Sequence, residues 1–223
     1  MVKEVRIYIE GGGDSKDQKT SLRKGFSQFF KQFFEKFQAK TKIIICCHPK
    51  IIMCGTRSHA FRDFKNALKS HPDAFNVLLV DAEAPVTKNS PWEHLKFRDN
   101  WDKPTGVDDD NCHLMVQTME AWFIADIETL REYYKQGFQE SGIPKTRNVE
   151  TIHKQGTNNK LERILKTATA NTIKKEYHKI NHASELLGRI DANKVCQASP
   201  YCDRLFTTLT SKMTVSTSNT DAE

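Results

Sequence analysis

The sequence has no apolar run long enough to cross a lipid bilayer, which takes about 20 residues in a helix. Apolar runs such as those within residues 42–47 and at 77–80 have the length of β-strands. The first residues lead directly into a strand-like segment and lack the apolar core and cleavage site of a signal peptide. We therefore expect a protein without a membrane segment that resides in the cytoplasm.

The six cysteines include no Cys-x-x-Cys pair. Zinc binding through Cys47, His48, Cys54 and the distant pair Cys112 and His113 is conceivable, but this spacing matches no zinc finger or ribbon. Free thiols in a reducing compartment are the preferred interpretation.

Two phosphate-binding motifs are absent as well. The three consecutive glycines at 11–13 belong neither to a Gly-x-x-x-x-Gly-Lys-Ser/Thr loop nor to a Gly-x-Gly-x-x-Gly fingerprint. A P-loop enzyme and a dinucleotide-binding fold are therefore unsupported. An aspartyl-phosphatase type of small phosphate-ester hydrolase, using Asp81 and Glu83, ranks low because that chemistry wants a second Asp and a position on the first strand.

The composition is that of an ordinary globular protein. The 223 residues are 38% hydrophobic and 28% charged, and the length is enough for one good-sized core or one core with a small appendage. The formal net charge of +6 suits a polyanionic partner such as a nucleic acid, although many proteins carry as much.

Strand-like and helix-like segments alternate through the first part of the chain. The strands are expected at 5–9, 43–47, 75–80 and 113–117, and the helices at 21–38, 57–69 and 119–134. A long loop with at most one short helix covers 85–111. This alternation predicts an α/β fold with a mostly parallel four-stranded sheet flanked by helices.

The second part of the chain contains no convincing strand. Helices are expected at 159–167, 174–180, 184–190 and 200–209. We therefore predict an α/β domain over 1–146, a helical extension over 147–210 packed on or near the sheet edge, and a disordered tail over 211–223.

Acidic residues follow the predicted strands. Glu10 ends the first strand, Asp81 and Glu83 end the third, and Glu120 follows the fourth, with Asp126 nearly two turns further on. Parallel strands end at the same edge of a sheet, so these carboxylates would converge there. Carboxylates packed together need a positive charge among them, and Mg²⁺ or Mn²⁺ with oxygen ligands supplies it.

Structural interpretations of these carboxylates stay open. Glu10 could line a turn, Asp81 could cap a helix, and Glu120 and Asp126 could form a solvated helix start. The Asp-x-Glu pair is more specific, because residues two apart on an extended segment point the same way.

Basic residues near element ends could bind a nucleic-acid backbone. The candidates are Arg57, which leads into the second helix, and Lys154, Lys160 and Arg163 in the helical extension. Lys174, Lys175 and Lys179 lie farther along, and Trp92 and Trp101 in the long loop could stack on bases. Solvated helix faces and core packing are the alternative interpretations.

Three segments together resemble the Toprim (topoisomerase–primase) superfamily. They are Ile-Tyr-Ile-Glu-Gly-Gly-Gly-Asp at 7–14, Val-Asp-Ala-Glu at 80–83 and Met-Val-Gln-Thr-Met-Glu-Ala-Trp-Phe-Ile-Ala-Asp at 115–126. The branch that looks most similar comprises small Toprim-like proteins encoded beside ATPases in prokaryotic defence loci, related to the nuclease half of overcoming-lysogenization-defect proteins.

The resemblance implies roles for individual residues. Glu10, Asp81 and Glu83 would be catalytic and would bind Mg²⁺, and Glu120 and Asp126 would extend this to a two-metal site. The activity implied is metal-dependent hydrolysis of nucleic-acid phosphodiesters in the cytoplasm. The family's Asp-x-Asp reads Asp81-x-Glu83 here, which motivates the alternative of a non-catalytic or partner-activated effector of an ATPase complex. Self-association into a homo-oligomer is also an expectation.

Overall fold

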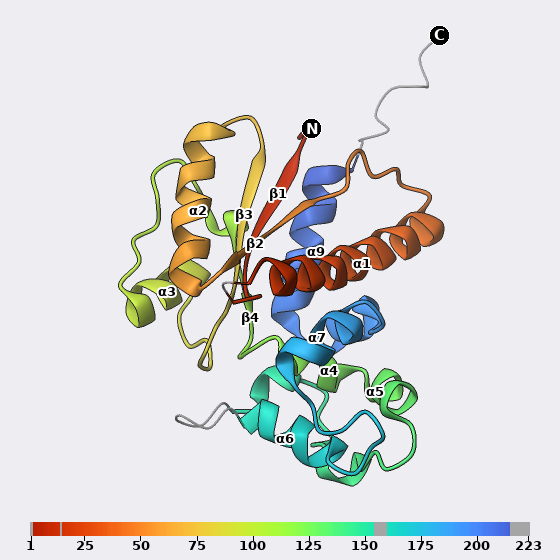
Figure 1. Ribbon diagram of the computed structural model, residues 1–223. Helices are drawn as coiled ribbons and strands as arrows, with labels where there is room; N and C mark the ends of the chain where they lie inside the picture. Colours follow the sequence, from red (N-terminus) through yellow and green to blue (C-terminus); the bar gives the residue numbers. More distant parts are fainter. Residues whose placement is uncertain (1, 14, 154–159, 215–223) are drawn as a thin grey trace.

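A computed structural model describes residues 2–13, 15–153 and 160–214 of the chain. Its centre is a parallel sheet of four strands, in the order β2 (Lys50–Gly55), β1 (Val5–Glu10), β3 (Phe75–Asp81) and β4 (Cys112–Met115). The sheet lies among helices (Figure 1). This confirms the predicted α/β class, with its parallel four-stranded sheet flanked by helices.

The helices fall into two groups along the chain. Those between strands are α1 (Lys16–Thr41), α2 (Arg57–Ser70), α3 (Pro91–Asp99) and the short 3₁₀ turn η1 (Asp109–Asn111). After β4 come α4 (Glu120–Ala125), α5 (Ile127–Tyr134), η2 (Glu140–Gly142), η3 (Val149–Thr151), α6 (Lys160–Thr169), α7 (Lys179–Leu187), α8 (Ala192–Ala198) and α9 (Pro200–Met213).

Apolar side chains on both faces of the sheet explain why helices cover both. Along β1, Ile7 and Ile9 belong to one buried cluster and Tyr8 to the other, as the two-residue period of a strand requires. The first cluster joins the sheet to α1 and α9, and the second joins it to α2 and α3 (Figure 1). Strands apolar on both faces are typical of parallel sheets.

Helix α9 ties the C-terminal part of the chain to the sheet. Its Phe206 packs on the phenylalanines of α1, with ring centroids 3.8 Å from Phe33 and 5.4 Å from Phe30. Arg204 donates to the carbonyl of Cys112 on β4 at 2.9 Å. The predicted helical extension therefore shares its hydrophobic core with the sheet, and the boundary at residue 146 does not divide that core.

The second strand lies later in the sequence than predicted. Residues 43–47 form no strand, and only Ile45 makes a single antiparallel bridge to Thr214. The apolar run exposes Ile43 and Ile44, whereas in β2 Ile51 faces the α1 cluster and Cys54 the α2 cluster. Side chains buried on both faces, rather than a continuous apolar run, define the strand that pairs with β1.

Several helix boundaries also differ from the prediction. The helix predicted at 119–134 breaks at Asp126, whose φ of −121° and ψ of 74° are not helical and whose side chain caps α5. The two helices predicted at 174–180 and 184–190 are replaced by the single helix α7, which starts at Lys179, and α8 was not predicted. The first residues of the predicted tail continue α9 to Met213, and residues 215–223 lie outside the described residues.

The start of α9 depends on one capping side chain. Ser199 accepts a hydrogen bond from the Cys202 amide at 3.2 Å and donates to Glu150 Oε1 at 2.6 Å. We expect Ser199→Ala to lower the free energy of unfolding by about 1–2 kcal/mol, because it removes a cap and a buried partner together. Urea unfolding should detect this loss, and Thr207→Ala on the exposed side of α9 should show little change.

None of the helices within the described ranges is long and apolar enough to span a bilayer.

Candidate functional site

Glu10 owes its position to a change of register at the end of β1. The β1–β2 pairing shifts between Ile9 and Glu10, so that Glu10 lies opposite Gly55. Gly11 and Gly55 then exchange two backbone hydrogen bonds, of 2.8 and 3.1 Å. Both glycines have positive φ, 128° and 85°, a conformation that side chains disfavour. This bridge fixes the turn and presents Glu10 at the carboxyl ends of the strands.

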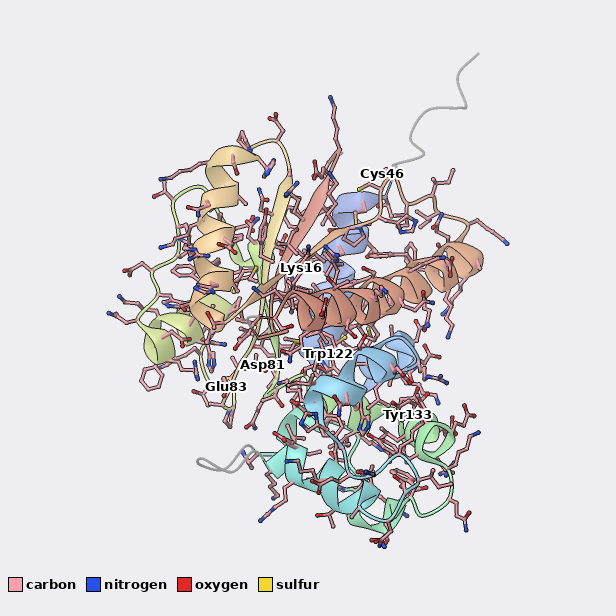
Figure 2. The ribbon with its side chains drawn as sticks, viewed as in Figure 1. Lys16, Cys46, Asp81, Glu83, Trp122 and Tyr133 are labelled. Atoms are coloured by element: carbon pink, nitrogen blue, oxygen red, sulfur yellow. The ribbon has the colours of Figure 1, made fainter. Side chains whose placement is uncertain are left out.

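Asp81 and Glu83 are held against the segment that follows β4. The backbone amide of Glu83 donates to the Gln117 carbonyl at 2.7 Å, and the Met119 amide donates to Asp81 Oδ1 at 2.8 Å. Glu83 itself has a left-handed backbone, with φ of 64°. Such conformations in residues with a side chain carry strain and cluster at functional sites. Figure 2 labels Asp81 and Glu83 at this end of the sheet.

Glu120 lies fully buried at the start of α4, with 0% of its surface exposed. Lys179 Nζ at the start of α7 lies 3.2 Å from Glu120 Oε1 and 3.9 Å from Asp81 Oδ2. Tyr177 donates to Glu120 Oε1 at 3.3 Å. The other oxygen, Glu120 Oε2, is buried without a hydrogen-bond partner among the described residues. One lysine therefore joins two carboxylates from distant parts of the chain.

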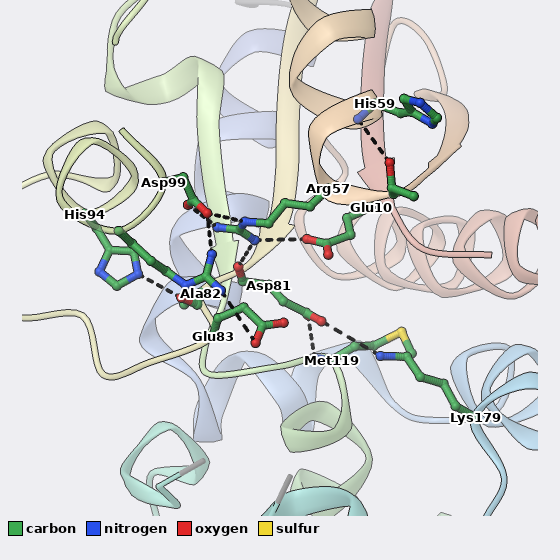
Figure 3. A network of polar contacts seen from close by, with 12 residues as sticks. Glu10, Arg57, His59, Asp81, Ala82, Glu83, His94, Asp99, Met119 and Lys179 are labelled. Carbon is green, nitrogen blue, oxygen red and sulfur yellow. Dashed lines mark hydrogen bonds and ion pairs between the residues drawn. The ribbon is translucent and has the colours of Figure 1, made fainter. Parts of the chain in front are cut away.

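Arg57 supplies a second positive charge. Its guanidinium donates twice to Asp99 on α3, at 3.0 and 2.8 Å, and also to Glu10 Oε2 at 3.0 Å and to the Asp81 carbonyl. The guanidinium carbon of Arg57 lies 5.2 Å from the centre of the Trp101 ring. Arg57 is thus fixed within the site, next to the carboxylates (Figure 3).

Arg98 of α3 completes this side of the site. Its guanidinium lies 3.8 Å from Glu83 Oε2 and also pairs with Asp99. We call Glu10, Asp81, Glu83 and Glu120 together the acidic cluster.

The carboxylates of the acidic cluster influence one another's ionisation. Burial raises the pKa of Asp81 to about 8; Lys179 opposes this shift, while Glu10, Glu120 and Glu83 add to it. Burial also raises the pKa of Glu10 despite the Arg57 charge. The pKa of Glu120 is lowered instead, because the Lys179 charge and hydrogen bonds to the carboxylate outweigh burial. The four side chains thus form one electrostatic unit, as their strand-end positions predicted.

Asp126 does not join the acidic cluster. Its carboxylate accepts from Lys194 Nζ at 2.8 Å, from the Asp191 amide at 2.9 Å and from the Thr129 hydroxyl at 2.7 Å. These partners connect α5 to the start of α8. In this structure Asp126 acts as a cap and a link between helices.

The predicted nucleic-acid-binding residues are scattered. Arg57 lies within the site, whereas Lys160 and the exposed Arg163 lie on α6. Lys154 lies outside the described residues. Trp92 is buried in the α2–α3 cluster and donates to the Asp108 carbonyl at 2.8 Å, so it anchors the long loop. Trp101 stacks on Phe61, with ring centroids 4.3 Å apart.

A family model for a domain of unknown function, DUF4276, matches residues 9–210. The chain belongs to this family. The match runs from the end of β1 into α9 and so includes every residue of the acidic cluster as well as Arg57 and Lys179. Neither the curated proteins nor the solved structures contain a match to the chain.

Sequence reasoning did not assign Asp99, Arg98 and Tyr177 to the site of this DUF4276 chain. Lys179 was named only as one of several lysines of the extension. Asp99 and Arg98 sit in a loop-rich stretch that carries many charges, so nothing in the pattern singles them out. Tyr177 and Lys179 lie 57 and 59 positions after Glu120 in the sequence, and only the fold brings them to it.

Proposed function

We propose that this protein is a divalent-metal-dependent nuclease that hydrolyses nucleic-acid phosphodiesters at the acidic cluster. The observation that carries the proposal is the convergence of four carboxylates, from three separate segments, on the carboxyl ends of parallel strands. Ligands of α/β folds bind at this edge. The proposal includes kinship with the Toprim superfamily, on the three motifs of the sequence, and a cytoplasmic location, which six free cysteines support.

The donor set suits Mg²⁺ or Mn²⁺ in its chemistry, because all four side chains offer carboxylate oxygens and the buried Glu120 Oε2 has no partner among the described residues. In the observed positions, Lys179 and Arg57 provide the positive charge instead. Across the described ranges, no group of three His, Cys, Asp or Glu side chains is placed to hold an ion. We infer that ion binding at Glu10, Asp81 and Glu120 requires Lys179 to leave its two carboxylates.

A divalent ion at these residues would supply charge neutralisation for the phosphate and lower the pKa of a bound water. The protein's own residues would do the rest. Asp99 fixes the guanidinium of Arg57, whose direction towards the cluster suits a phosphate oxygen. Lys179, freed from Glu120, would offer a second cation to the developing negative charge.

The test is cleavage of plasmid DNA, single-stranded DNA and tRNA with Mg²⁺ or Mn²⁺, and with EDTA instead. We expect ion-dependent cleavage, lost in Glu10→Gln because the carboxylate charge is removed while the shape is kept. Glu35→Gln, on the exposed side of α1, is the matched control and should cut like the wild type. Equal cleavage by Glu10→Gln and wild type would exclude the acidic cluster as the active site.

A second candidate is a partner-activated effector held by an ATPase. One observation favours it: Lys179 and Arg57 already neutralise the carboxylates, which suits a resting state that a partner releases. In that case the purified protein alone should not cut, and addition of an ATPase encoded beside its gene, with ATP, should switch cleavage on. Full activity of the isolated chain would rule this candidate out.

A further inference from the structure

A cleft of about 420 Å³ opens beside the acidic cluster. It lies between the glycine loop that follows β1, the first turns of α1, and helices α6 and α7. Lys179 connects the two features: it lines the cleft, and its ammonium contacts Glu120 and Asp81. The volume is near the lower end of the roughly 300–1,000 Å³ typical of ligand pockets. The cleft is therefore of a size to hold a single nucleotide rather than a nucleic-acid duplex.

Apolar side chains line much of the cleft. Leu22 comes from α1, whereas Ile180 and Ala183 come from α7. Ile180 is 53% exposed, so its surface is open to a ligand. Apolar surfaces contributed by two helices suit the flat face of a nucleobase.

The polar lining favours an anion. Lys166 pairs with the carboxylate of Glu162 at 3.0 Å, and His178 and Lys179 bring further nitrogen atoms to the lining. The glycine loop packs closely on α1, because Gly12 has φ of 84° and a Cβ there would lie 2.9 Å from Lys19 Cα.

We propose that this cleft binds one nucleoside monophosphate unit, with its base against Leu22 and Ile180 and its phosphate at Lys179. The choice of ligand rests on the proposed nuclease function, since the unit bound would flank the phosphate to be cut. The same chemistry has two sources: the terminal nucleotide of a single strand, or a free mononucleotide.

Binding can be measured without cleavage, in EDTA, by calorimetry on the full chain. The probes are adenosine 5′-monophosphate, a short 5′-phosphorylated single strand, a blunt duplex and inorganic phosphate. We expect the mononucleotide and the single strand to bind, and Ile180→Asp to weaken both at least about tenfold. Ile173→Asp is the matched control, because Ile173 is 82% exposed and lies outside the cleft lining. It should bind like the wild type.

The arms of the experiment distinguish the sources. Tighter binding of the single strand identifies a strand end as the occupant, and equal binding of the mononucleotide identifies a free nucleotide. Three results overturn the proposal: no binding of either probe, equal binding by Ile180→Asp and wild type, or inorganic phosphate binding as tightly as the mononucleotide.

Failure of this inference is separable from failure of the proposed function. The protein could bind nucleotides in a way that depends on Ile180 and yet cleave no nucleic acid with any ion. That result would support the nucleotide-binding cleft and contradict the proposed nuclease function. The protein could instead show ion-dependent cleavage that Ile180→Asp leaves unchanged, and bind no nucleotide. That result would support the nuclease function and contradict the nucleotide-binding cleft.

Discussion

Replacement of Lys179 by methionine is expected to destabilise the protein by about 2–3 kcal/mol, because it leaves the charge of Glu120 buried and unpaired. Removing one partner of a fully buried ion pair costs about 3–5 kcal/mol. Here the Lys179 side chain is 44% exposed, so water can reach the vacated position and the cost is smaller. Chemical unfolding at neutral pH measures the difference.

The matched control is the double variant Lys179→Met with Glu120→Gln. Neutralising Glu120 removes the unpaired charge, so most of the lost stability should return. A double variant as unstable as Lys179→Met alone would show that methionine disturbs α7 by packing rather than by charge.

The same variant tests how Lys179 relates to a metal ion. If the ammonium occupies the place of an ion, Mg²⁺ or Mn²⁺ should stabilise Lys179→Met more than the wild type, and the gain should grow with ion concentration. Thermal unfolding with and without each ion gives this readout independently of catalysis. An equal ion effect on both proteins would argue that Lys179 does not compete for the site.

Replacement of Asp81 by asparagine is expected to stabilise the protein at alkaline pH. Burial raises the pKa of Asp81 from 3.8 to about 8, so the folded state holds its proton more tightly than the unfolded state. This contribution to stability is complete below about pH 4 and is lost as the pH rises towards 8. Asparagine keeps the oxygen that accepts from Met119 but cannot ionise, so it avoids this loss.

We expect Asp81→Asn to exceed the wild type by at least about 1.4 kcal/mol at pH 8, the free energy of one pKa unit, and to match it near pH 4. Unfolding curves over this pH range measure the difference. If the proposed nuclease activity depends on the acidic cluster, the variant should also lose that activity, because it removes one carboxylate. A wild type that is more stable than Asp81→Asn throughout would mean that Asp81 is ionised and well paired.

Asp126 provides a comparison of opposite sign. Burial would raise its pKa, but hydrogen bonds from Lys194, the Asp191 amide and Thr129 outweigh burial and lower it. A lowered pKa contributes stability above the unfolded value, and this stability is lost as the pH falls through the folded value. Asp126→Asn should therefore destabilise the protein at pH 7, where Asp81→Asn does not. Together the two variants separate a carboxylate whose charge costs stability from one whose charge contributes to stability.

Three features of the acidic cluster lower the stability of the fold. A buried carboxylate with a raised pKa, a buried glutamate oxygen without a partner among the described residues and a left-handed Glu83 each carry a cost in stability. Residues that destabilise a fold are tolerated where function needs them. This is the physical reason to expect the active site at this edge of the sheet rather than at Asp126.

Local pattern in the sequence determined the strand ends and the residues that follow them. Residues 5–9 and 75–80 are rich in apolar and β-branched side chains and form strands as predicted, so the acidic residues directly after them lie at the carboxyl edge of the parallel sheet. The second strand was predicted in the wrong place. Residues 43–47 are more apolar than β2, but they are not covered by other side chains on both faces.

Tertiary structure alone decided what neutralises the acidic cluster and what lies beside it. Lys179 contacts Glu120, and Asp99 fixes Arg57. Leu22 and Ile180 line one cleft. The two residues of each pair lie at least tens of positions apart in the sequence. Such contacts depend on how helices pack against the sheet, and helical periodicity gives the buried face of a helix but not its neighbour. The sequence alone therefore determined where the carboxylates gather, and packing decided that a lysine and an arginine meet them there.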